Sequence, residues 1–120
     1  MSKEVYILGG YQTDFARNWS KERKHFVAMI RESVAGALRD AKVAPEEIES
    51  GHVGNFAASL YAKQGHIGAF FVEADPAFSG LPTGRHEAAC ASGSIALLAA
   101  SAEIEAGRYD VQCVVGVEQM

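Results

Sequence analysis

Short runs of apolar residues alternate along this chain with longer stretches that carry apolar residues every three or four positions. The first pattern is typical of buried strands and the second of helices. The predicted strands are Val5–Leu8, His52–Phe56, Arg85–Ala89 and Val111–Val117. The predicted helices cover about residues 20–42, 64–73 and 91–106, with one short turn at 44–48. Strands separated by helices favour right-handed crossovers, so we predict an α/β fold with a mixed, mostly parallel sheet and helices on both faces.

The length of 120 residues is typical of one domain, and 48% hydrophobic residues are enough for a folded core. A net charge of −4 argues against a nucleic-acid partner, which would require a basic surface. No apolar run approaches the roughly 20 residues of a membrane-spanning helix. The two cysteines are too few for a disulfide framework. We therefore predict a soluble cytoplasmic protein without a membrane partner.

The most informative segment is residues 86–98, in which Cys90 lies where a predicted strand meets a helix that is poor in bulky side chains. The only large residues between Ala88 and Ala102 are Ile95, Leu97 and Leu98. A helix of this kind lets other backbones approach closely, so we expect it to be a buried central helix. A thiol at a helix start faces unpaired backbone N–H groups and the positive end of the helix dipole, which favour the thiolate. The same N–H groups can bind an oxyanion, so the pattern predicts covalent acyl transfer.

The residues by themselves leave a second interpretation of Cys90 open. Cysteine is among the most buried residue types and often acts as a small hydrophobic side chain. Cys113 lies in the middle of the last predicted strand, and we predict that it is a core residue. Gly93 favours a substrate site instead, because a residue without a Cβ lets a ligand approach the backbone.

The four histidines are scattered along the sequence. In an extended strand His86 shares a face with Cys90, so it could tune the thiol or be a structural histidine at the strand edge. The other three lack the spacing of metal ligands: His25, His52 and His66. We therefore predict no metal site.

Residues 87–94, with the sequence EAACASGS, resemble the nucleophile motif of the thiolases, the acetyl-CoA acetyltransferase family. Further similar segments follow the family's order along essentially the whole chain: Val5–Leu8 with Thr13–Phe15, Gly54–Asn55, Gly107–Asp110 and Val114–Met120. The last two are similar to the family's GxYD and GxExM signatures. The amino-acid sequence of the motif most resembles that of archaeal and bacterial thiolases related to the sterol-carrier-protein type. Three departures from residues common elsewhere in the family favour the same branch: Gln12, Asp14 and His66.

The resemblance implies that Cys90 is the acyl-thioester nucleophile and that its backbone N–H donates to the thioester oxyanion. It also implies that Ser92 and Gly93 lie near the acyl or pantetheine end of coenzyme A. Coenzyme A would be a substrate, and no tightly bound cofactor is implied. The implied reaction is acyl transfer between a 3-oxoacyl-CoA and CoA, or the reverse Claisen condensation.

The resemblance further implies an incomplete N-terminal half-domain. Members of the family are several times longer, and their second half supplies an activating histidine, an acid–base cysteine and an Asn-Glu-type oxyanion motif. Residues 1–120 would then be a truncated N-terminal domain that lacks the C-terminal domain and is inactive alone. The chain also stops directly after its last predicted strand, which leaves a sheet edge for another segment to cover. We therefore expect a homo-oligomer or a complementing thiolase chain.

Two alternatives remain at this point. The first is a ketosynthase-type condensing enzyme of the same superfamily, which also places its cysteine between alanines. The second is a non-catalytic, thiolase-like assembly subunit that keeps the fold and pairs with another chain. The amino-acid sequences of residues 107–110 and 116–120 favour a thiolase over a ketosynthase.

Overall fold

The computed structural model describes residues 3–119, which form two α-helices and one three-stranded sheet. The helices and strands are α1 (Phe26–Ala41), β1 (Ser50–Gly54), β2 (Thr83–His86), α2 (Ser92–Glu105) and β3 (Gln112–Gly116). Shorter helical turns are η1 (Pro45–Glu47), η2 (Ala58–Ala62), η3 (Ile67–Ala74) and η4 (Pro76–Phe78). None of the helices in this range is long and apolar enough to cross a membrane. Met120, the last residue of the GxExM segment, lies outside the described residues.

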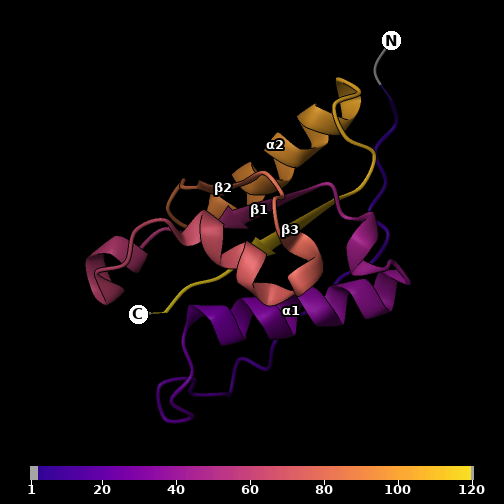
Figure 1. Cartoon of the computed structure of the whole chain (residues 1–120). Helices are drawn as coiled ribbons and strands as arrows, with labels where there is room; N and C mark the ends of the chain where they lie inside the picture. The colour runs from indigo at the N-terminus through magenta and orange to yellow at the C-terminus, as the bar shows by residue number, and fades with distance from the viewer. Residues whose placement is uncertain (1–2, 120) are drawn as a thin grey trace.

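The sheet has the strand order β2-β1-β3, and both neighbouring pairs are parallel. Gly54, at the end of β1, is paired with His86 of β2 and with Gly116 of β3, so the carboxyl ends of all three strands meet at one edge. In Figure 1, α2 covers one face of the sheet and α1 lies on the other face. The predicted α/β fold, with a parallel sheet and helices on both faces, is therefore confirmed.

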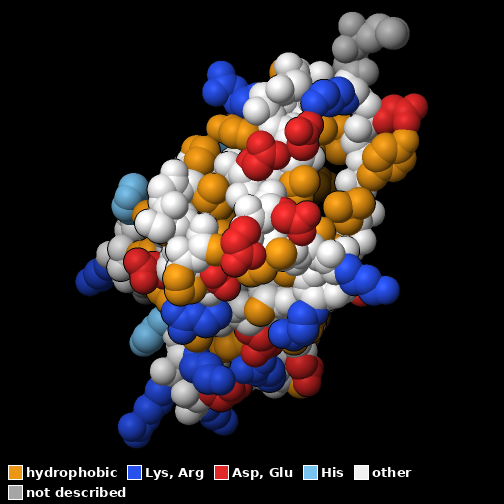
Figure 2. Space-filling model, turned by 45° about the vertical axis from the view of Figure 1, so that its right-hand side comes forward, with side chains coloured by type: hydrophobic (Ala, Val, Ile, Leu, Met, Phe, Trp, Pro, Cys, Tyr) orange, Lys and Arg blue, Asp and Glu red, His pale blue; other side chains and the backbone are white. Residues whose placement is uncertain are grey.

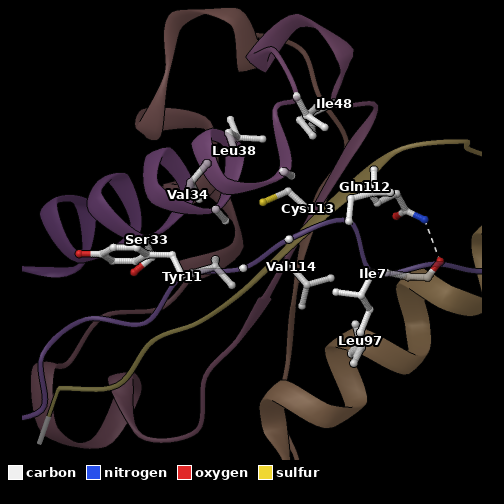
Figure 3. A pocket seen from close by; sticks show the side chains of 18 of the residues that line it. Ile7, Tyr11, Ser33, Val34, Leu38, Ile48, Leu97, Gln112, Cys113 and Val114 are labelled. Atoms are coloured by element: carbon white, nitrogen blue, oxygen red, sulfur yellow. Dashed lines mark hydrogen bonds between the residues drawn. The ribbon is translucent and has the colours of Figure 1, made fainter.

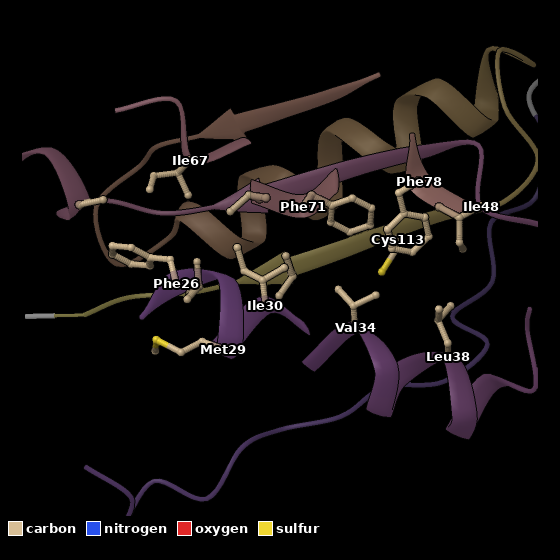
Figure 4. Packing of buried hydrophobic residues seen from close by; sticks show 14 residues of the cluster. Phe26, Met29, Ile30, Val34, Leu38, Ile48, Ile67, Phe71, Phe78 and Cys113 are labelled. Atoms are coloured by element: carbon tan, nitrogen blue, oxygen red, sulfur yellow. The ribbon is translucent and has the colours of Figure 1, made fainter. Parts of the chain in front are cut away.

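The core lies between α1 and the sheet and is completed by η3 and η4 (Figure 4). Ile30 and Val34 enter it from α1, while Phe71 and Phe78 stack with their ring centroids 4.9 Å apart. Cys113 joins this cluster from β3 and is 8% exposed. Burial raises the pKa of the Cys113 thiol to about 11, so this thiol stays protonated near neutral pH. The prediction that Cys113 is a core residue is confirmed.

Helix α1 begins at Phe26, later than the predicted start near residue 20. Arg23 has a left-handed backbone conformation with a φ of 57°, which a continuous right-handed helix does not allow. The preceding segment turns instead. The N–H of Lys24 donates to the carbonyl of Trp19 at 3.0 Å, and the Arg17 guanidinium lies 3.8 Å from the centre of the Trp19 ring. Helix α2, by contrast, was predicted to within one residue at either end, because the residues that begin and end it are its immediate neighbours in the sequence.

The predicted strand Val5–Leu8 is wrong, because this segment pairs with no strand of the described structure. It runs beside β3, one of the two edge strands of the sheet, and a cavity of about 540 Å³ is lined by the segment, β3 and both helices (Figure 3). The Gly10 N–H donates to the Asp40 carboxylate at 2.9 Å, and Ile7 lies beside Leu97 of α2. The run has the apolar character of a strand, but a strand also requires regular main-chain hydrogen bonds to a neighbour.

Helix α2 leaves large apolar side chains in solvent. Its buried residues are all small: Ser92, Ala96 and Ala100. Three of its four large apolar residues are between 41% and 64% exposed, namely Ile95, Leu97 and Leu98, while Ile104 is half-buried. Figure 2 shows hydrophobic side chains between the charged ones across one face of the molecule. Within residues 3–119 the sheet packs on one side of α2 and Ile7 lies beside Leu97. Apolar side chains on more than one side of a helix are typical of a position between two layers.

Candidate active site

Cys90 lies in a tight turn, residues 87–91, that joins the end of β2 to the start of α2. We call this turn the elbow. Cys90 is exposed, in contrast to the buried Cys113. Ala89, directly before Cys90, has a φ of 52°, a left-handed conformation that a residue with a Cβ adopts only when its surroundings hold it. The predicted junction of strand, cysteine and helix is therefore present, and an exposed thiol does not fit the interpretation of Cys90 as a small core residue.

The elbow is held by two side chains that bind its backbone. The Glu87 carboxylate accepts the Ala89 N–H at 2.6 Å. The Ser92 hydroxyl accepts the Ala88 N–H at 2.9 Å and donates to the Ala89 carbonyl at 2.7 Å. These bonds fix the left-handed residue from both sides. The structure thus places the predicted binding residue Ser92 directly after the elbow, where its hydroxyl binds the backbone on the N-terminal side of Cys90.

The first turn of α2 presents free backbone donors. The helix begins after Ala91 without a side-chain cap. The N–H groups of Gly93 and Ser94 donate to no other described residue. Gly93 is exposed, and a Cβ placed on it would meet no atom within 4 Å, so a ligand can reach this backbone. Free N–H groups at a helix start stabilise an anion, such as a thiolate or the oxyanion of a thioester.

Strand β1 packs against the start of α2. A Cβ placed on Gly54 would lie 2.7 Å from both Cα and N of Gly93, which is closer than non-bonded atoms can approach. The backbones of β1 and α2 are therefore in direct contact at this point. Gly54, which the sequence singles out only by its family resemblance, thus packs against the first turn of α2, directly after the elbow.

His86 is bound to a second histidine rather than placed for Cys90. His86 Nε2 lies 2.8 Å from Nδ1 of His52, which is buried. The other ring nitrogen of His52 lies 3.0 Å from the Glu103 carboxylate and 2.7 Å from the Gln112 side-chain oxygen. The structural interpretation of His86 is therefore the one that the contacts support. Within residues 3–119 no group of three or more His, Cys, Asp or Glu side chains is arranged to hold a metal ion.

This histidine pair predicts that the chain loses stability in mild acid. Burial, and next the charge of His52, lower the pKa of His86, while Glu103 acts in the opposite direction. Because this pKa is lower in the folded chain, the unfolded chain binds more protons below about pH 6.5. The stability contributed by neutral His86 is present above about pH 6.5 and is lost as the pH falls towards the folded-state pKa.

We expect the urea midpoint of unfolding, followed by circular dichroism, to be lower at about pH 5.5 than at pH 7.5. His86→Gln should reduce this difference. The matched control is His25→Gln, because His25 is exposed and precedes α1. An equal pH dependence in the wild type and His86→Gln would contradict the argument.

The comparisons with known proteins agree with this geometry. Residues 5–120 match the family described as thiolase, N-terminal domain. An acetyl-CoA acetyltransferase of Methanothermobacter thermautotrophicus is 35% identical over 98% of this chain, and one of Methanocaldococcus jannaschii is 36% identical over 98%. A non-specific lipid-transfer protein-like 2 of Caenorhabditis elegans is 30% identical over 98%. The chain spans 30%, 29% and 27% of the lengths of these three relatives.

The family match covers nearly the whole chain, as the order of the sequence motifs predicted. It includes the strand, elbow and helix around Cys90 as well as the last strand. The chain therefore belongs to the thiolase family and corresponds to the N-terminal domain of its members.

Proposed function

We propose that Cys90 is the nucleophile of an acyl transfer between 3-oxoacyl-CoA and CoA, catalysed by a thiolase of which this chain is a part. The observation that carries the proposal is an exposed thiol on a backbone-held elbow, close to a helix start where the Gly93 and Ser94 N–H groups donate to no other described residue. The elbow holds the nucleophile, and the helix start offers donors for the charge that develops on the substrate. The names of two relatives, both acetyl-CoA acetyltransferases, support acyl-CoA as the substrate class.

The reaction would proceed in two steps. The Cys90 thiolate bonds to the keto carbon of the 3-oxoacyl-CoA, and the bond from that carbon to its neighbour on the thioester side breaks. The electron pair leaves as the enolate of acetyl-CoA or propanoyl-CoA, which takes up a proton. The thiolate of CoA then attacks the acyl-cysteine, and Cys90 leaves as the thiolate. The Cys90 N–H would donate to the thioester oxyanion, and Gly93 would leave room for the acyl or pantetheine end of the substrate.

We further propose that the rest of the enzyme packs on α2 and completes the site. The chain spans about 30% of its relatives' lengths, and the large apolar residues of α2 are exposed. A second domain, or another copy or chain of the same family, would bury this surface and provide the acid–base groups for proton transfer. We therefore expect residues 1–120 to form a covalent acyl adduct without turnover.

Intact-mass spectrometry after incubation with acetyl-CoA or acetoacetyl-CoA tests the proposal. We expect one acyl adduct that maps to Cys90 and is absent from Cys90→Ala. The matched control is Cys113→Ala, which should keep the adduct because the Cys113 thiol is buried and protonated. Iodoacetamide should also modify Cys90 at neutral pH faster than a free peptide thiol. An adduct that persists in Cys90→Ala, or no adduct at all, would refute the proposed role.

A further inference from the structure

The loop that follows β1 is bound from two sides by oppositely charged side chains. Arg85, in β2, donates from Nε to the Asn55 carbonyl at 3.1 Å and from Nη2 to the Phe56 carbonyl at 2.8 Å. Glu118, two residues after the end of β3, accepts the Phe56 N–H at Oε2 and the Ala57 N–H at Oε1, both at 2.8 Å. One cation therefore binds two successive carbonyls, and one anion binds two successive N–H groups.

These four bonds act on only two peptide units. The Asn55 carbonyl and the Phe56 N–H belong to one unit, and the Phe56 carbonyl and the Ala57 N–H belong to the next. Each unit thus has the Arg85 guanidinium at its oxygen and the Glu118 carboxylate at its N–H. A peptide dipole is most stable when its oxygen faces a cation and its N–H faces an anion, and hydrogen bonds to charged groups are stronger than neutral ones. We call this arrangement the peptide clamp.

The Asn55 side chain connects the peptide clamp to the carboxyl end of the sheet by hydrogen bonds. Its side chain is fully buried and donates to the Val117 carbonyl at 2.8 Å and to Glu118 at 3.0 Å. Its oxygen accepts the Ala58 N–H at 3.3 Å. The clamp therefore connects the carboxyl ends of β1, β2 and β3, the edge of a parallel sheet at which ligands generally bind.

The clamped loop flanks the elbow. The Asn55 N–H donates to the His86 carbonyl at 3.1 Å, so the loop leaves the sheet beside the last residue of β2 before the elbow. Gly54, one residue earlier, is in direct backbone contact with Gly93 at the start of α2. Any shift of the loop would therefore alter the space around Cys90.

We propose that Arg85 and Glu118 are positioning residues for the Cys90 site. Together they hold the peptide units 55–56 and 56–57 in one fixed conformation beside the elbow. The role rests on the proposed acyl transfer. Neither residue needs to touch the reacting atoms. Their effect passes through the backbone of residues 55–57, whose conformation decides how an acyl-CoA fits against the thiol.

The first test is amide hydrogen exchange by NMR on the full chain. In Glu118→Gln, the Phe56 and Ala57 amides should exchange about tenfold faster, because they lose a charged acceptor. Arg85→Met should accelerate the same two amides, although Arg85 contacts only carbonyls. The double variant should show less than the combined effect, because both side chains act on the same peptide units. Unchanged Phe56 and Ala57 amides in Arg85→Met would overturn the clamp.

The second test separates positioning from folding. Acylation of Cys90 by acetyl-CoA should fall about tenfold in both single variants, whereas alkylation by the small reagent iodoacetamide should change by less than about threefold. Arg85→Lys, which keeps the cation, should retain more acylation than Arg85→Met. The matched control is Arg31→Met, because Arg31 also donates to a backbone carbonyl, that of Glu73, but from α1. It should change neither reaction.

Each outcome is decisive. Parallel loss of both reactions, together with faster exchange of the buried Val53 amide, would show a merely structural role and overturn the proposal. A wild type that acylates normally, with variants that acylate equally well, would overturn the positioning role and leave the proposed function intact. A wild type that is alkylated but never acylated would instead overturn the proposed function, and the positioning role with it.

Discussion

Phe71→Ala is expected to lower the free energy of unfolding by about 3–5 kcal/mol, the range typical of buried aromatic residues replaced by alanine. The Phe71 side chain is fully buried, stacks on Phe78 at an interplanar angle of 24° and packs against Gly51 of β1. Its removal would open a cavity between η3 and the sheet, because the surrounding backbone cannot collapse onto it. Since small domains are stable by only about 5–15 kcal/mol, much of the total stability would be lost.

Urea unfolding followed by circular dichroism measures this change. The matched control is Phe15→Ala, because Phe15 is 89% exposed. That variant should lie within about 0.5 kcal/mol of the wild type. Similar losses for the two phenylalanines would mean that the described packing of η3 on the sheet is not the packing in solution.

Gly54→Ala is expected to lower stability by about 1–3 kcal/mol, the usual cost of adding a methyl group to a packed interior. The new Cβ would lie 2.7 Å from the backbone of Gly93, and a backbone cannot move aside as a flexible side chain can. The start of α2 would have to lift from β1, and the elbow with it. Because this contact holds the start of α2, which directly follows the elbow, the rate of Cys90 alkylation should also change.

The neighbouring strand provides the control for this substitution. Gly84 lies in β2, and a Cβ placed on it would meet no atom within 4 Å. Gly84→Ala should therefore change stability by no more than about 0.5 kcal/mol and leave the alkylation rate unaltered. Equal effects at both glycines would show that loss of glycine, rather than the contact with α2, is responsible.

The pattern of apolar residues was sufficient to predict α2, the last strand and the parallel sheet. These features depend on local periodicity and on helix-ending residues such as Gly107, whose φ is 78°. The start of α1 could not be predicted in the same way. Residues 20–25 are all polar or charged, so no apolar spacing marks a helix start among them. The left-handed Arg23 prevents a continuous right-handed helix there, and the Lys24 N–H donates to the Trp19 carbonyl instead.

The run Val5–Leu8 has the composition of a buried strand and yet pairs with no strand within residues 3–119. Strand pairing depends on a neighbour with free main-chain groups in the correct register, and composition carries no information about that neighbour. The same reason applies to the histidines. Nothing in their spacing indicates that His52 and His86 share a hydrogen bond, because β1 and β2 bring them together across 34 positions.

The amino-acid sequence by itself determined the family, the α/β class and the position of Cys90 between a strand and a helix, because motifs and local periodicity are properties of neighbouring residues. Only the tertiary structure decided the conformation around Cys90 and the contacts of the neighbouring loop: Ala89 is left-handed, the Ser92 hydroxyl binds the backbone of the elbow, and Arg85 and Glu118 bind the loop after β1. The contacts of Arg85 and Glu118 join residues that are far apart along the chain. They exist because three parallel strands end at one edge, where their terminal residues meet.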